Sequence, residues 1–119
     1  MNKGWYKGSV HNPSGAKGWL IGAFLDKDHP CSTGALEVSR KVMGPETKEK
    51  KHNHKVATEF WIVIQGSVNI IIDDHPLELK TGEYLLVNPG TPTEILWAKK
   101  GTVVIVAKAP SITTDKYPC

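Results

Sequence analysis

KHNHKVATEFWIVIQG, residues 51–66, is the stretch that decides the fold of this chain. Side chains on a β-strand alternate between two faces, so His52 and His54 point the same way. Glu59 lies an odd number of residues after His54, so one unbroken strand would turn it to the opposite face. If all three side chains converge, a turn lies between them and Glu59 begins the next strand. Two imidazoles and a carboxylate form a donor set that suits a divalent metal ion.

Short strand patterns separated by turn residues fill most of the remaining chain. They predict strands over residues 19–25, 35–43, 60–65, 68–73, 77–79, 84–87, 93–98 and 102–108. Gly66-Ser67 joins two of them as a hairpin, and no segment has a helical period. The pattern favours one all-β domain over residues 1–119, with its barrel core over about 19–108 and an irregular lead-in and tail.

The predicted strand 35–43 alternates between two kinds of side chain. Leu36, Val38 and Val42 share one parity, and polar residues occupy the other, as in a half-buried strand. Residues 60–64 behave differently. If Glu59 points inward, Phe60, Ile62 and Ile64 point outward, although all three are large and apolar. A strand that is apolar on both faces is covered on both, which predicts a homodimer or a cover formed by the first strand or the tail.

Composition sets the expected class of protein. The 15 Lys and Arg residues exceed the 12 Asp and Glu residues by three, and the two signs are interspersed, so nucleic-acid binding is not expected. No apolar run reaches the roughly 20 residues that span a bilayer, and the first residues lack the apolar region of a signal peptide. We therefore expect a soluble cytoplasmic protein without membrane contact, in which Cys31 and Cys119 are free thiols.

Two motifs in this order resemble those of the cupin superfamily. In the first, His52-x-His54 is followed by four residues, then Glu59, then six residues and Gly66, with Gly44 upstream. The second is Gly82 to Pro92, which contains Pro89-Gly90. Thr93 stands where the family usually places its last ligand histidine, and Trp97 stands where an asparagine is usual. Segments near residues 18–22 and 109–116 also look like small single-domain bacterial cupins.

The resemblance implies a double-stranded β-helix, or jelly roll, with a pocket in the barrel mouth. It implies His52, His54 and Glu59 as ligands of a divalent metal such as Zn, Mn, Fe or Ni, with Thr93 as a poor fourth ligand. The expected function is binding of that metal and of a small polar molecule, a sugar or an organic acid. Two alternatives remain: a metal-free isomerase that uses the histidine pair as acid and base, and a binding module whose pocket is lined by Trp61, Val63 and Trp97.

Overall fold

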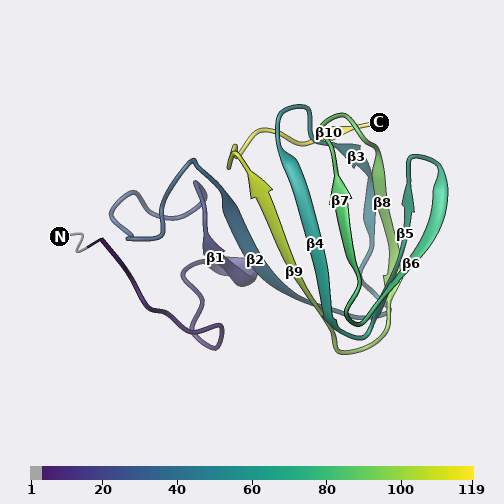
Figure 1. The fold of residues 1–119 in the computed structure, drawn as a ribbon, viewed down its shortest axis with the longest axis horizontal. Helices are drawn as coiled ribbons and strands as arrows, with labels where there is room; N and C mark the ends of the chain where they lie inside the picture. Colours follow the sequence, from purple (N-terminus) through teal and green to yellow (C-terminus); the bar gives the residue numbers. More distant parts are fainter. Residues whose placement is uncertain (1–3) are drawn as a thin grey trace.

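A computed structural model describes residues 4–119 and consists almost entirely of strands and turns (Figure 1). The elements are η1 (Ala16–Gly18), β1 (Trp19–Ile21), β2 (Glu37–Met43), β3 (Glu49–Asn53), β4 (Thr58–Gln65), β5 (Ser67–Ile72), β6 (His75–Lys80), β7 (Tyr84–Val87), β8 (Thr93–Ala98), β9 (Thr102–Ala109) and β10 (Tyr117–Pro118). Within the described residues, no helix is long and apolar enough to cross a membrane.

The strands form two five-stranded antiparallel sheets that face each other as a barrel. One sheet has the order β1-β2-β9-β4-β7, and the other has the order β10-β3-β8-β5-β6. This arrangement confirms the predicted all-β jelly roll. Figure 1 shows the segment before β2 extending beside the barrel, with β1 and η1 against the β2 edge.

Backbone conformation at the turns explains how the chain passes between strands. Gly66, with a φ of 94°, joins β4 to β5, and a side chain there would collide with Thr102. Asp73 and Asp74 both have positive φ and form the two-residue turn between β5 and β6. The predicted hairpins therefore lie where the turn residues place them.

The apolar core lies between the sheets. Ten buried side chains form it: Met43, Trp61, Val63, Val68, Ile70, Leu79, Ile95, Ala98, Val104 and Val106. Most strand bounds differ from the sequence prediction by one or two residues, and two differences are larger. The strand predicted over 19–25 ends at Ile21, where the backbone of Gly22 turns to bond Cys31. In the tail, Tyr117–Pro118 pairs with β3 as an edge strand.

β2 is half-buried as predicted, but its polar side chains are the ones that face the barrel interior. Glu37 and Ser39 are buried, whereas Val42 is 64% exposed. The reason is local, because this part of the interior is a cavity whose wall includes charged side chains, among them Glu37 and Lys41. A polar stripe on a strand therefore lines the cavity here.

The outer face of the β2-β9-β4-β7 sheet is apolar and open. Phe60, Ile64, Tyr84 and Leu86 are 38%, 51%, 68% and 55% exposed. Phe60 and Tyr84 also pack ring against ring, with centroids 5.4 Å apart. An apolar sheet face of this kind is typical of an interface between subunits.

We expect two copies of the chain to associate through this face in solution. A stable interface buries on the order of 1,600 Å² in total. Sedimentation equilibrium at micromolar concentration should give twice the mass of one chain, and Ile64→Glu should give the single-chain mass with an unchanged circular dichroism spectrum. Leu77→Glu, at an exposed apolar residue of β6 in the other sheet, is the matched control and should leave the mass doubled. A wild-type protein with the mass of one chain contradicts the prediction.

Candidate functional site

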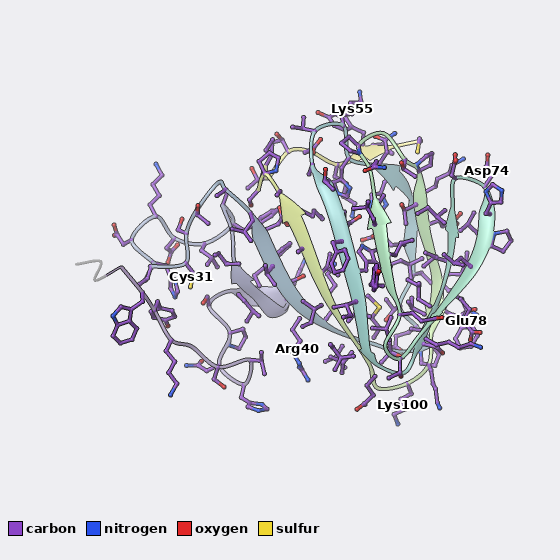
Figure 2. The ribbon with its side chains drawn as sticks, viewed as in Figure 1. Cys31, Arg40, Lys55, Asp74, Glu78 and Lys100 are labelled. Carbon is purple, nitrogen blue, oxygen red and sulfur yellow. The ribbon has the colours of Figure 1, made fainter. Side chains whose placement is uncertain are left out.

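The barrel holds a cavity of about 530 Å³ between the two sheets, at the end where β4 begins and β9 ends. His52, His54 and Glu59 all line it, and each is buried, with exposed fractions of 5%, 7% and 5%. The predicted turn lies between them, with His52 on β3 and Glu59 on β4. Figure 2 labels Lys55 at this end of the barrel and Lys100 at the opposite end.

The connection from His54 to Glu59 is held by the C-terminal tail. The buried Asp115 carboxylate accepts hydrogen bonds from the backbone N–H groups of Lys55 (2.8 Å), Val56 (3.1 Å) and Ala57 (2.8 Å). Burial alone would raise the pKa of Asp115, but these three hydrogen bonds outweigh it and hold the pKa below its ordinary value of 3.8.

A second hydrogen bond fixes the same connection from another side. The Gly90 N–H donates to the His54 carbonyl at 2.6 Å, so the Pro89-Gly90 turn sits directly on the histidine segment. The two sequence motifs thus meet in space through the backbone.

The two imidazoles differ in their surroundings. The His52 Nδ1 lies 2.8 Å from the Lys50 carbonyl, and its Nε2 lies 3.4 Å from a Glu49 carboxylate oxygen. The His54 Nδ1 lies 3.9 Å from a Glu59 oxygen, and its buried Nε2 has no hydrogen-bond partner in the described part of the chain. Burial, Lys108 and His52 lower the pKa of His54 to about 4, so its ring is neutral at pH 7.

Lys108 connects two carboxylates across the cavity wall. Its Nζ lies 3.8 Å from Glu37 and 3.9 Å from Glu59. Burial raises the pKa of both carboxyl groups, and the Lys108 ammonium opposes that rise only in part. Ser111 donates a hydrogen bond to the other Glu37 oxygen at 3.2 Å. The cluster Glu37–Lys108–Glu59 is therefore a buried acid–amine–acid row.

A second charged group lies on the opposite wall. Lys116 pairs with Glu49 at 3.1 Å. Burial alone would raise the pKa of Glu49, but the charges of Lys116, His52 and Lys41 outweigh burial and hold this pKa below its ordinary value. Burial lowers the pKa of Lys41, which has no ion pair or hydrogen bond from its side chain to any described residue. Lys41 is thus the half-buried amine of this cavity that lacks an internal partner.

The structure places the other predicted residues at different depths. Thr93 lies directly opposite His52 in the β3–β8 pair, and its buried hydroxyl has no hydrogen-bond partner among the described residues. Trp61 lines the cavity. Val63 does not, because it lies two residues further along β4, fully buried in the apolar core below.

The predicted pocket role of Trp97 is wrong. Its side chain is 46% exposed on the outer surface. The cause is a register shift between β5 and β8, where Ile95 pairs with Ile70 but Trp97 pairs with Asn69. One extra residue in β8 shifts the alternation of its side chains, so that Ala98 and not Trp97 faces inward, where it is fully buried.

Several cavity residues were not singled out from the sequence. They are Glu37, Lys41, Glu49, Lys108, Asp115 and Lys116. Strand parity was the signal for Lys108, which continues the inward series of Val104 and Val106 on β9. The same rule misleads for Glu37 and Lys41, because on β2 the polar residues face the cavity. No local pattern marks Asp115, because its partners lie 58 to 60 residues away.

The side chains as they lie do not fit the implied metal. Within residues 4–119, no three His, Cys, Asp or Glu side chains come together in an arrangement that could hold an ion. The nitrogen of His52 that is free of the backbone faces Glu49, while Glu59 faces His54 and the Lys108 ammonium. A cation at Glu59 would repel Lys108. Metal binding by the trio stays a prediction.

Asp115 should be a strong determinant of stability. Asp115→Ala leaves three backbone N–H groups without their acceptor, so we expect it to lower the free energy of unfolding by about 2–3 kcal/mol. Because the folded pKa is depressed, the stabilisation is full above the ordinary pKa of 3.8 and is lost as the pH falls through the lower folded value. Urea unfolding at fixed protein concentration, from pH 7 to pH 2.5, measures both effects.

Asp28→Ala is the control for that experiment, since it removes a carboxylate from an exposed turn. It should change the unfolding free energy by less than about 0.5 kcal/mol. An equal effect of the two substitutions, or a difference between wild type and Asp115→Ala that does not shrink in acid, contradicts the role assigned to Asp115.

Comparisons with known proteins agree with this architecture. A comparison with curated proteins found no match. Among solved structures, a cupin protein from Bacteroides fragilis is similar over 98% of this chain and 92% of its own, with a TM-score of 0.71 and 20% identity. A sugar phosphate isomerase of the cupin superfamily from Silicibacter pomeroyi is similar over 63% of this chain and 50% of its own, with a TM-score of 0.56 and 16% identity.

A salicylate 1,2-dioxygenase mutant from Pseudoaminobacter salicylatoxidans is similar over 70% of this chain and 25% of its own, with a TM-score of 0.58 and 15% identity. At these identities the likeness concerns the fold alone, and the neighbours carry different chemistries on it. The sequence pattern of the cupin domain matches residues 40–107, more than half of the chain. The chain therefore belongs to the cupin family.

Proposed function

We propose that the barrel cavity binds a small polar molecule, such as a sugar or an organic acid, through protein side chains and without a metal. One observation carries the proposal. The buried, cavity-lining His54 Nε2 has no hydrogen-bond partner among the described residues, and the Glu37 Oε2 has only the Lys108 ammonium at 3.8 Å, beyond hydrogen-bond distance. Buried polar atoms are rarely left unbonded, so these two support a ligand that brings its own polar groups.

The rest of the wall suits the same kind of ligand. Glu37 and Glu59 can accept hydrogen bonds from hydroxyl groups, and Lys41 and Lys108 can donate to carbonyl or carboxylate oxygens. The apolar side of the cavity includes Trp19 and Phe24, whose stacked rings lie 4.6 Å apart. A few polar groups on an apolar and aromatic wall are typical of small-molecule sites.

Proton transfer is the second candidate function, and the Glu59–Lys108 contact favours it. A carboxylate beside an ammonium can remove a proton from a carbon next to a carbonyl, while the ammonium stabilises the negative charge on the enolate oxygen. Glu59 then returns a proton to the same carbon, which restores the carbonyl group and leaves that hydrogen exchanged with solvent. Burial raises the pKa of Glu59 and makes it a better base, whereas His52 is fixed by Lys50 and Glu49.

Ligand binding is tested on tag-free protein treated with a chelator. A panel of aldoses, ketoses, uronic acids and 2-oxo acids is screened by thermal shift, and hits are titrated by calorimetry. His54→Leu keeps a similar volume but removes the nitrogen, so we expect affinity to fall by about 3- to 10-fold. His75→Leu, at an exposed histidine at the start of β6 and outside the cavity, should leave affinity unchanged.

Two results would contradict metal-free binding. One is that no panel member stabilises the protein while a stoichiometric metal is found in it. The other is that binding appears only after Zn²⁺, Mn²⁺, Fe²⁺ or Ni²⁺ is added, in which case the predicted trio is a metal site.

Proton transfer predicts exchange of a ligand C–H for deuterium. Nuclear magnetic resonance in D₂O should show loss of the signal next to the carbonyl of a bound hit, and Glu59→Gln should slow that loss by about 100-fold or more because the amide is not a base. Glu78→Gln, on the exposed strand β6 (Figure 2), should have no effect. Equal exchange rates in wild type and Glu59→Gln rule out Glu59 as the base and leave a binding module.

A further inference from the structure

A second hollow of about 510 Å³ opens beside the cavity, at the edge of β2. β1 covers β2 only at Val38 and Ser39, so the edge beyond them is left open. The segment around η1 forms one wall of this hollow, and the residues that lead into β3 form another. We call it the basic hollow, because lysine and arginine residues form much of its lining.

Four cationic side chains line the basic hollow, Lys17, Arg40, Lys41 and Lys48, against one carboxylate, Glu49. None of the four forms an ion pair with a described residue. Glu49 is already engaged, by Lys116 at 3.1 Å and by His52 at 3.4 Å. The hollow therefore has uncompensated positive charge, which attracts anions.

The basic hollow is continuous with the barrel cavity. Lys17, Lys41, Met43, Glu49 and Ile95 line both of them. The shared wall means that one small molecule can place one end in the cavity and the other end among the cations.

The backbone around η1 lies close against β2 at the basic hollow. Lys17 has a φ of 58°, which is uncommon for a residue other than glycine. Gly18 follows it against the Arg40 backbone, where a side chain would collide with the Arg40 carbonyl. In Figure 2 the Arg40 side chain leaves β2 on the side of the N-terminal segment.

We propose that the basic hollow is an oxyanion subsite that holds the carboxylate or phosphate group of the cavity ligand. The inference rests on the proposed binding of a small polar molecule and narrows it to anionic members of that class, acidic or phosphorylated. Arg40 supplies the paired donors that suit a planar or tetrahedral oxyanion, and Lys48 adds a second charge at the rim.

The test titrates full-length protein with orthophosphate and, separately, with acetate, at constant low ionic strength and with detection by amide chemical shifts. We expect saturable binding of at least one probe, with shifts at residues around Arg40 and Lys48, and the tighter probe identifies the group. The double substitution Arg40→Gln and Lys48→Gln should weaken that probe by about 10-fold or more. These two residues are chosen because they line the basic hollow and do not line the cavity.

Lys99→Gln with Lys100→Gln is the matched control, since it removes the same charge from the exposed β8–β9 turn. It should change affinity by less than about 2-fold. Absence of saturable binding of both probes, or equal weakening by the control, overturns the subsite.

His54→Leu separates this inference from the proposed function. It should leave probe binding intact, because His54 does not line the basic hollow. Intact probe binding together with failure of every cavity ligand would leave the subsite standing and the proposed function wrong. Loss of probe binding in His54→Leu would place the anion in the main cavity and overturn the subsite.

Discussion

The Asp115 carboxylate bound to three consecutive backbone N–H groups is the contact on which the site depends. Residues 55–57 must turn sharply so that His54 and Glu59, an odd number apart, can face the same cavity. No side chain of that turn accepts these N–H groups; the acceptor comes from the tail, 58 to 60 residues away. The tail also brings Ser111 to Glu37 and Lys116 to Glu49. One segment thus fixes the turn and completes the polar wall.

Charge inside the cavity is arranged in contacts between lysines and carboxylates, and these contacts orient the motif residues toward protein partners. Lys108 stands between Glu37 and Glu59, and Lys116 stands beside Glu49. A buried carboxylate needs a counter-charge, and here a lysine provides it where a metal could do so. The three motif residues are all present and buried, yet their surroundings orient them toward different partners. Spacing alone identifies such residues but does not determine what they bind.

The sequence was sufficient for features that depend on local pattern. Strand parity placed His52 and His54 together and Phe60 and Ile64 outside, and the glycine and aspartate turns fell where expected. Prediction from the sequence failed where contacts between distant strands change which side chains face inward. A one-residue bulge in β8 carried Trp97 to the surface. The cavity also reversed the usual meaning of alternation in β2, because the inward side chains there line a cavity with charged groups and not the apolar core. Neither effect is visible in a single strand.

Strand β4 shows why these features are linked. Its inward residues pass from Glu59 in the cavity, through Trp61 at the cavity wall, to Val63 in the core, while Phe60, Ile62 and Ile64 form the outer apolar face. Successive residues of one strand rise only about 3.3 Å, so the site, the core and the outer face share the same backbone. A second copy of the chain packed on Phe60 would restrict the strand that carries Glu59. Association through the outer face would therefore also make the cavity wall more rigid, which lowers the entropic cost of ordering it around a ligand.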